Sequence, residues 1–197
     1  MPLVRIDVLE GHTPRQKVEI EAGPCRLRRW RMTDLDALLR HADNPAVARN
    51  LRDLFPSPYT RADAREWLGD PLHDVVPLST FAIEADGEAV GGIGLVPGRD
   101  VERFSAEIGY WLGEAVWGRG LATAALRAAT EYGFARLGLR RIFALPFATN
   151  AGSSRVLAKA GYRLEARLAD SAFKEGRFVD QELWAALAPT WRGILPG

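Results

Sequence analysis

The stretch Gly118-Arg119-Gly120 lies between an expected strand and an expected long helix. The first backbone N–H groups of a helix have no partner inside the helix, and the helix dipole adds partial positive charge at the same end. Because glycine has no Cβ, a ligand can approach its backbone closely. The N–H groups of residues 118–123 therefore form a candidate phosphate-binding site.

Three kinds of phosphate site use a glycine-rich loop of this sort. A dinucleotide fold needs G-x-G-x-x-G directly after a strand, but Thr123 stands at the third glycine and five residues separate the strand from Gly118. Arg140 and Arg141 could still meet the 2′-phosphate of NADP. A P-loop needs G-x-x-x-x-G-K-[ST], a string that the sequence lacks. The third possibility is a cradle for the phosphates of a pantetheine cofactor.

Two motifs resemble those of the GNAT family of N-acetyltransferases. W-G-R-G-L-A at residues 117–122 resembles the [QR]-x-x-G-x-[GA] signature, with Trp117 in place of the first Gln or Arg, as is typical of the RimJ/RimL-like branch that acetylates ribosomal proteins. T-N-A-G-S-S-R-V-L-A-K-A-G-Y at residues 149–162 resembles that branch's N-x-x-S-x-x-(V/L)-x-x-K-x-G-(F/Y) motif. E-I-G-Y-W-L at 107–112 and L-R-R-W-R-M-T-D at 27–34 fit as well, so the resemblance covers about residues 25–188.

The resemblance implies that acetyl-CoA lies between two splayed central strands. The strand before the loop would offer backbone groups to the pantetheine arm, and the loop would hold the pyrophosphate, with a charge from Arg119 and a hydroxyl from Thr123. Asn150 would bind the pantetheine region or cap the helix that follows it. The implied cofactor-binding residues are Ile108, Tyr110, Trp111, Leu112, Trp117, Gly118, Arg119, Gly120, Leu121, Ala122, Thr123, Asn150 and Ser153.

Acetylation of an amine needs a base for the amine proton and an acid for the leaving thiolate. Glu107 is the candidate base, since several family members carry a catalytic Glu on this strand; it could instead be a sheet carboxylate paired with an arginine. Glu165 is a weaker candidate. Many relatives place a tyrosine acid where this sequence has Leu157. Ser153, the branch's usual residue one turn earlier, is the candidate acid, although it could simply help to cap the helix.

The elements that must position these residues predict an α+β fold. Strands are expected at residues 26–31, 79–85, 89–96, 104–112, 141–145, 162–173 and 178–186, and helices at 33–42, 47–51, 60–68, 119–137 and 150–160. Thr33, Thr60 and Asn150 are the expected helix starts, and Asp86-Gly87 is a two-residue hairpin turn. The resemblance implies the GNAT fold, with a mixed, mostly antiparallel sheet of about six to seven strands and helices on both faces.

Composition limits the class of protein. The 197 residues carry a formal net charge of +1, so a basic coat for nucleic acid is absent. The single Cys25 and the scattered histidines predict neither disulfides nor a metal site. No run of 18 apolar residues occurs. We expect a cytoplasmic protein, monomeric or homodimeric, with no metal, nucleic acid or membrane partner. Residues 118–167 nevertheless hold nine basic against two acidic side chains, which indicates a local anion site.

The predicted organisation is one GNAT domain over residues 25–190, with an N-terminal strand or arm at 1–24 and a tail at 191–197. Residues 1–17 resemble the start of small tautomerases that use an N-terminal proline, here Pro2, as base. Because the rest of that fold is not recognisable, we expect an edge strand over Leu3–Leu9 or a flexible arm.

The predicted function is direct transfer of an acetyl group from acetyl-CoA to the primary amine of a protein N-terminus or a small molecule. Two alternatives stay open. One is a non-catalytic GNAT-like module that binds coenzyme A or another ligand, and the other is an NADP-binding oxidoreductase.

Overall fold

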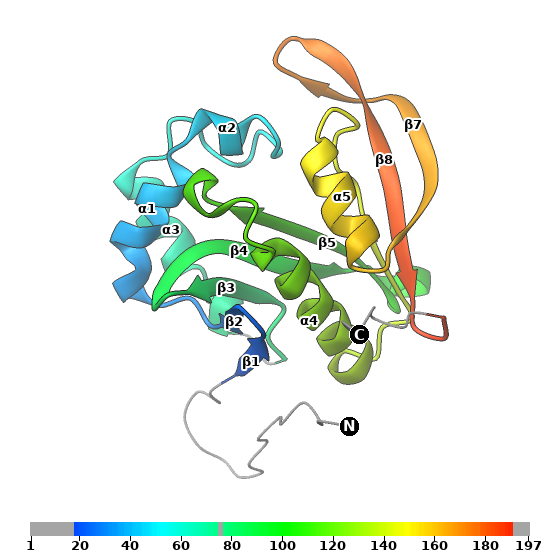
Figure 1. The fold of residues 1–197 in the computed structure, drawn as a ribbon, viewed down its shortest axis with the longest axis horizontal. Helices are drawn as coiled ribbons and strands as arrows, with labels where there is room; N and C mark the ends of the chain where they lie inside the picture. The colour runs from blue at the N-terminus through cyan, green and yellow to red at the C-terminus, as the bar shows by residue number, and fades with distance from the viewer. Residues whose placement is uncertain (1–17, 75–76, 191–197) are drawn as a thin grey trace.

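The computed structural model describes residues 18–74 and 77–190, which form one eight-stranded sheet with helices on both faces (Figure 1). The strand order is β1-β2-β3-β4-β5-β6-β8-β7, and every neighbouring pair is antiparallel except the parallel pair of β5 and β6. The predicted mixed, mostly antiparallel α+β fold is confirmed. The strands are β1 (Glu19–Ala22), β2 (Cys25–Arg28), β3 (Thr80–Ala85), β4 (Glu88–Pro97), β5 (Ser105–Leu112), β6 (Arg141–Ala144), β7 (Arg163–Lys174) and β8 (Arg177–Leu187).

The sheet has one strand more than the six to seven expected. The extra strand is β1, which pairs with β2 from Glu19 opposite Arg28 to Ala22 opposite Cys25. Four residues with only Ile20 and Ala22 buried give too short an alternation to indicate a strand in sequence. The strand expected at Leu3–Leu9 lies outside the described residues.

The helices cover the sheet in two groups. These helices are α1 (Leu35–Ala42), α2 (Pro45–Ala48), α3 (Arg61–Gly69), α4 (Leu121–Arg136) and α5 (Ala151–Lys159). The described part of the sheet has one hydrophobic cluster on each face. Alternate residues of β3 belong to different clusters, because neighbouring side chains in a strand point to opposite faces. Phe81 and Ile83 pack in the cluster that contains α4 and α5, whereas Ala82 packs with α1 and α3.

Thr60 and Asn150 start helices as predicted, but Thr33 does not. Thr60 accepts a hydrogen bond from Asp63 N at 3.3 Å. Thr33 lies inside a 3₁₀ turn (Met32–Asp34), and α1 begins at Leu35. The reason is the buried Asp34, whose carboxylate accepts hydrogen bonds from Arg31 N at 2.9 Å and from both terminal nitrogens of Arg28 at 2.7 and 2.9 Å.

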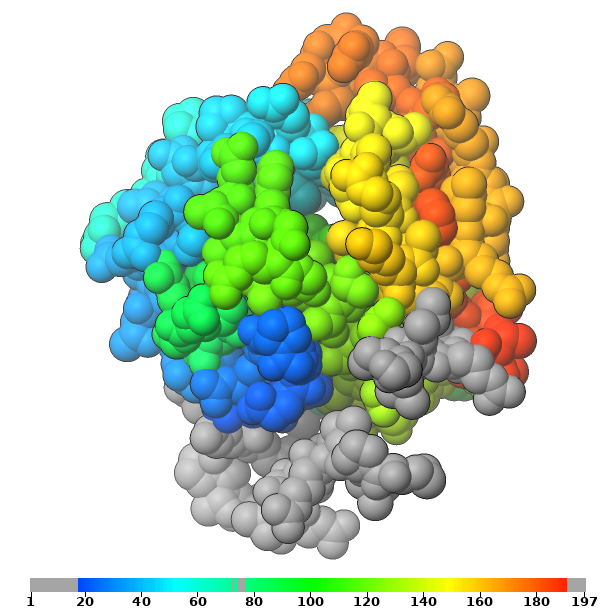
Figure 2. All heavy atoms as spheres, in the orientation of Figure 1, coloured from blue at the N-terminus to red at the C-terminus, as the bar shows by residue number. Residues whose placement is uncertain are grey.

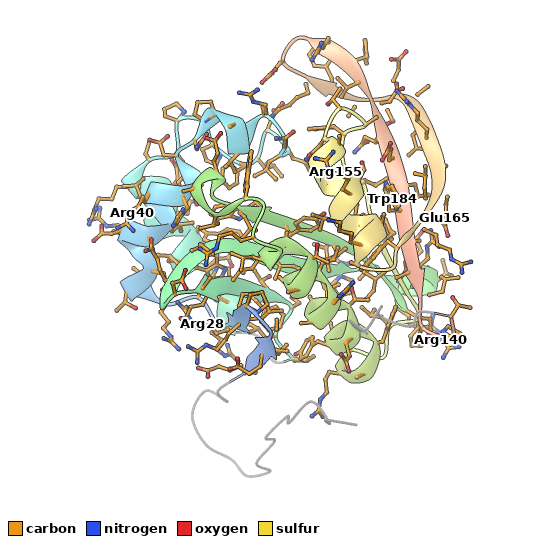
Figure 3. All side chains as sticks on the ribbon, viewed as in Figure 1. Arg28, Arg40, Arg140, Arg155, Glu165 and Trp184 are labelled. Atoms are coloured by element: carbon orange, nitrogen blue, oxygen red, sulfur yellow. The ribbon has the colours of Figure 1, made fainter. Side chains whose placement is uncertain are left out.

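Arg28 continues this network to the sheet, because it also pairs with Glu84 on β3. Burial disfavours the charge on Glu84, but hydrogen bonds from Arg28 and Arg26 outweigh burial and lower the pKa of that carboxyl. Figure 3 shows Arg28 near the β1 and β2 side of the molecule, remote from α5. The network therefore joins strands to the entry of α1 and takes no part in the cavity described below.

Among the helices of the described residues, none is long and apolar enough to cross a membrane.

Candidate active site

A cavity of about 1040 Å³ opens between β5, β6, α5, the N-terminus of α4 and the segment that runs from α2 to α3. Figure 2 shows the opening between that segment, the loop before α4 and α5. Apart from the weaker candidate base Glu165, the structure brings every residue that the sequence proposed for cofactor binding or catalysis to the wall of this one cavity. They are Glu107, Ile108, Tyr110, Trp111, Leu112, Trp117, Gly118, Arg119, Gly120, Leu121, Ala122, Thr123, Asn150 and Ser153.

The central strands separate at the cavity. β5 pairs with β6 only over residues 105–107 and 141–143, although β5 continues to Leu112. On its other side β5 stays paired with β4 along its whole length. One edge of the second half of β5 therefore borders the cavity instead of a neighbouring strand, as expected for splayed strands.

The backbone of β5 turns polar groups toward this opening. Ser105 O and Gly113 N both hydrogen-bond toward β4, at 2.8 and 2.9 Å. Because the peptide groups of successive residues point to opposite sides of a strand, those of Ile108 and Tyr110 turn away from β4 and toward the cavity. Strand β5 thus offers N–H and C=O groups to a ligand with amide groups of its own.

The loop before α4 has the conformation that its glycines permit. Gly118 and Gly120 both have φ of +79°, a left-handed conformation that costs other residues free energy. No atom lies within 4 Å of the position that a Cβ on either glycine would take. The Trp117 indole fixes the loop to β5, since its Nε1 donates to Leu112 O at 2.8 Å. The loop is therefore an open, preformed turn at a helix N-terminus.

The Arg119 guanidinium is not available to this turn as an unpaired charge, because it already forms an ion pair. Its Nη2 lies 2.8 Å from Asp86 Oδ2 in the β3–β4 hairpin, and both side chains are exposed. An anion bound at the start of α4 would compete with Asp86 for the Arg119 guanidinium.

Asn150 and Ser153 begin α5 on the other side of the cavity. Asn150 Oδ1 accepts a hydrogen bond from Ser153 N at 3.1 Å, so the side chain caps the helix. Capping uses the carbonyl oxygen, and the Nδ2 amide is the part of Asn150 that can serve a ligand. The two roles weighed for Asn150 in the sequence are therefore compatible.

Ser153 Oγ forms a hydrogen bond of 2.8 Å with the hydroxyl of Tyr110. Burial raises the pKa of Tyr110 to about 12, although the hydrogen bond with Ser153 acts in the opposite direction. Leu157, one turn further along α5, is fully buried in the core. The hydroxyl groups of Ser153 and Tyr110 therefore lie together at this wall.

Glu107 lies on the opposite face of the sheet from Tyr110, because the two positions differ by an odd number of residues along β5. Its carboxylate forms an ion pair with Arg52, from the segment between α2 and α3. The candidate base Glu107 and the hydroxyl groups of Tyr110 and Ser153 thus border the same cavity from the two faces of one strand.

Glu165 and the NADP-related arginines lie elsewhere. Arg141 Nη1 donates to Glu165 Oε1 at 2.8 Å, and this hydrogen bond lowers the pKa of Glu165. Neither residue lines the cavity, and Figure 3 places Arg140 and Glu165 at the outer side of the molecule near β7 and β8. Glu165 is thus excluded as a base for this cavity, and no phosphate at the loop before α4 is positioned to meet Arg140 or Arg141.

The sequence predicts acceptor specificity in residues 33–78, including F-P-S-P-Y at 55–59, and Arg52, Phe55 and Tyr59 of this segment do line the cavity. They reach it only through the tertiary fold. Two further residues of the wall were missed in the sequence. Arg155 and Lys159 also line the wall, and their i, i+4 spacing on one face of α5 was a readable signal. Figure 3 shows Arg155 on α5.

Residues 25–163 match the family model described as the acetyltransferase (GNAT) domain. The chain belongs to the GNAT acetyltransferase family. This GNAT protein is 28% identical over 171 residues to the N-acetyltransferase p20 of Bacillus licheniformis, covering 85% of this chain and 94% of that one. It is 29% identical over 147 residues to spermidine N(1)-acetyltransferase of Escherichia coli K12, covering 68% and 78% of the two chains.

Solved structures agree with this assignment. RimJ of Mycobacterium smegmatis, in complex with a CoA-disulfide, superimposes with a TM-score of 0.74 at 29% identity, covering 85% of this chain and 84% of RimJ. The protein is therefore an acetyl-CoA-dependent N-acetyltransferase of the GNAT family. The alternative of an NADP-binding oxidoreductase has no support, because that fold needs a parallel doubly wound sheet.

Proposed function

We propose that this N-acetyltransferase passes the acetyl group directly to the primary amine of a protein N-terminus or a small molecule, in the cavity at the open edge of β5. The observation that supports this proposal is that groups from separate elements of the fold meet in one cavity. Backbone groups of β5, the N-terminus of α4 and the side chains of Glu107 and Ser153 come from separate elements and line one cavity.

The loop end of the cavity fits the phosphates of acetyl-CoA. A bulky anion finds open space beside Gly118 and Gly120 and unpaired N–H groups at the start of α4. We assign the backbone of residues 118–123, together with Arg119 and the Thr123 hydroxyl, to the pyrophosphate. Trp117 supports this end by holding the loop against β5.

The pantetheine arm fits the open edge of β5. We assign its amide groups to the backbone of Ile108 and Tyr110 and to the Nδ2 amide of Asn150. Leu112 closes this edge toward the loop, since its carbonyl already accepts from Trp117. Trp111 contributes differently, because its ring packs against Phe55 on the α1–α3 face at a centroid distance of 5.5 Å. We therefore assign Trp111 to the amine side of the cavity.

Acetyl-CoA supplies an activated acetyl thioester. The carboxylate of Glu107, held by Arg52, accepts the proton that the amine loses. Ser153 Oγ donates a proton or a hydrogen bond to the sulfur as it leaves, and Tyr110 orients that hydroxyl. The two proton-handling groups border the cavity from opposite faces of β5, which lets an amine and a thioester meet between them.

A thermal-shift experiment tests the cofactor assignment. Acetyl-CoA should raise the Tm, because a ligand that binds only the folded state stabilises it. Glu107→Gln and Ser153→Ala should keep that shift and lower kcat about a hundredfold, the usual size of a general acid or base contribution. Glu165→Gln is the matched control, since it removes a carboxylate outside the cavity. Absence of a Tm shift at millimolar acetyl-CoA would overturn the assignment.

The turnover measurement separates this proposal from a non-catalytic module. A module would gain the same Tm shift and release no coenzyme A with any primary amine. Release of coenzyme A that depends on both an amine and Glu107 supports the enzyme.

A further inference from the structure

The face of β5 that carries Glu107 has an empty position between two functional side chains. Glu107, Gly109 and Trp111 are alternate residues, so they share one face of the strand. Gly109 is exposed, and no atom lies within 4 Å of the place of its missing Cβ. A rise of about 3.3 Å per residue puts Gly109 about 7 Å from each neighbour. The strand therefore presents a slot with a carboxylate at one end and an indole at the other.

The wall across from this slot is aromatic. Phe55 lies between Trp111 and Tyr59, with ring centroids 5.5 and 5.0 Å away. Tyr59 is buried, whereas Phe55 and Trp111 are partly exposed to the cavity. The remaining side chains on this side are mostly apolar and include Leu38, Val47, Leu51 and Trp67. An apolar group that enters the slot meets ring faces and aliphatic carbon.

The charges of the cavity suit one ammonium group and disfavour several. Within the part of the chain that the structure describes, Glu107 is the one carboxylate in the cavity wall, and it is paired with Arg52. The basic side chains of the wall are Arg52, Arg119, Arg155 and Lys159. A polyamine with one amine at Glu107 would bring a further positive charge toward Arg52, and like charges at short range repel.

From the slot, the aromatic wall and the single carboxylate, we infer that the acceptor is a small monoamine carrying an aromatic body, of the arylalkylamine type. This inference rests on the proposed function. The amine lies at Glu107 and the ring occupies the slot at Gly109 against Phe55 and Trp111. The amine nitrogen bonds to the acetyl carbon as the carbon–sulfur bond breaks. Glu107 takes the proton that nitrogen loses, and the leaving thiolate takes a proton from Ser153 Oγ, which regains one from solvent.

An amine panel tests the inference with the full-length protein. Release of coenzyme A is measured with 2-phenylethylamine, propylamine, spermidine and a trialanine peptide with a free N-terminus. Rates are compared per unit of neutral amine, because an α-amino group has a pKa near 8, well below that of alkylamines. We expect kcat/KM for 2-phenylethylamine to exceed that of propylamine by about tenfold or more, because 2-phenylethylamine buries an aromatic ring in the slot and propylamine has no ring to bury. We expect it to exceed that of spermidine and of the peptide as well.

Two variants test the position of the ring. Gly109→Val fills the slot in open space at a strand position that tolerates branched residues, and it should remove the preference for 2-phenylethylamine over propylamine. Phe55→Ala should raise KM for 2-phenylethylamine and leave KM for propylamine nearly unchanged. Phe104→Ala is the matched control, because Phe104 is exposed and outside the cavity wall. Both cavity variants should keep the Tm shift with acetyl-CoA.

The outcomes are distinct. If acetyl-CoA gives no Tm shift, or if the shift is present and no amine is used, the proposed function fails. If the shift is present and spermidine, propylamine or the peptide is used as well as or better than 2-phenylethylamine, only the inference on the acceptor is overturned. Unchanged selectivity in Gly109→Val would overturn the placement of the ring.

Discussion

The hydroxyl of Tyr110 on β5 lies 2.8 Å from Oγ of Ser153 on α5. It also lies 3.4 Å from the Ser153 carbonyl oxygen, so the phenol contacts both oxygen atoms of that residue. With its pKa raised to about 12, first by burial, Tyr110 stays neutral and can donate or accept at physiological pH. The strand and the helix on the two sides of the cavity are thus joined at the candidate acid.

This contact predicts that Tyr110 positions Ser153. Tyr110→Phe keeps the ring and removes one hydrogen bond, worth about 1 kcal/mol, so we expect kcat to fall about fivefold with little change in KM for acetyl-CoA. The Tm should fall only slightly. The double variant Tyr110→Phe/Ser153→Ala should be no slower than Ser153→Ala alone. Additive losses in kcat would show that the two hydroxyls act independently.

Burial also predicts how the protein behaves at alkaline pH. It raises the pKa of all four tyrosines, to about 12 for Tyr59 and Tyr110, and it raises the pKa of Cys25 to about 11. A raised pKa means that folding favours the protonated form, so this stability is complete below the unfolded-state values. It is lost as pH rises from about 9 through 12.

The measurement is a spectrophotometric titration of phenolate absorbance beside unfolding curves. We expect the free energy of unfolding to fall steadily above about pH 9, and phenolate to appear only together with unfolding. The urea-unfolded protein is the control and should titrate near the ordinary tyrosine pKa of about 10. Phenolate formation near pH 10 in a still-folded protein would contradict the prediction.

The sequence predicts the parts of the site that depend on local structure. The glycines at 118 and 120 indicate a left-handed turn, and the periodicity after them indicates a helix, so the candidate anion site follows from neighbours in the chain. Asn150 is likewise a local signal, because a cap bonds residues two or three positions ahead. These features survive in the fold because short-range geometry creates them.

The contacts between the candidate site residues and side chains distant in the sequence could not be predicted in this way. Arg52 and Glu107 are 55 residues apart, Tyr110 and Ser153 are 43 apart, and Asp86 and Arg119 are 33 apart. Each depends on how the splayed sheet places a loop, a helix or a hairpin beside β5 or α4. Strand β1 was missed for the same reason, because its stability comes from β2 and from the core rather than from its own four residues.

The left-handed turn at Gly120 predicts a matched pair of glycine variants. Gly120→Ala adds a Cβ at φ of +79°, which costs roughly 1–2 kcal/mol and distorts the turn that presents the N–H groups of α4. We expect the Kd for coenzyme A, measured by calorimetry, to rise about fivefold or more. Gly69→Ala, at a position with open space and no positive φ, should leave Kd unchanged. Equal Kd values for the two variants would contradict the role of the turn.

The ion pair between Arg119 and Asp86 predicts a gain of affinity. Asp86→Asn removes a negative charge beside the proposed phosphate site, and asparagine accepts the left-handed backbone that Asp86 has at φ of 53°. Because both side chains are exposed, losing the pair should hardly change stability.

We expect Asp86→Asn to lower the Kd for coenzyme A about threefold at low salt, and Arg119→Gln to raise it. Both effects should shrink at high salt, because screening weakens interactions between exposed charges. Asp36→Asn is the control, since Asp36 forms a comparable exposed pair with Arg61 at 2.8 Å and lies outside the cavity wall. An unchanged Kd in Asp86→Asn, with a raised Kd in Arg119→Gln, would show that Arg119 reaches the phosphates without competition from Asp86.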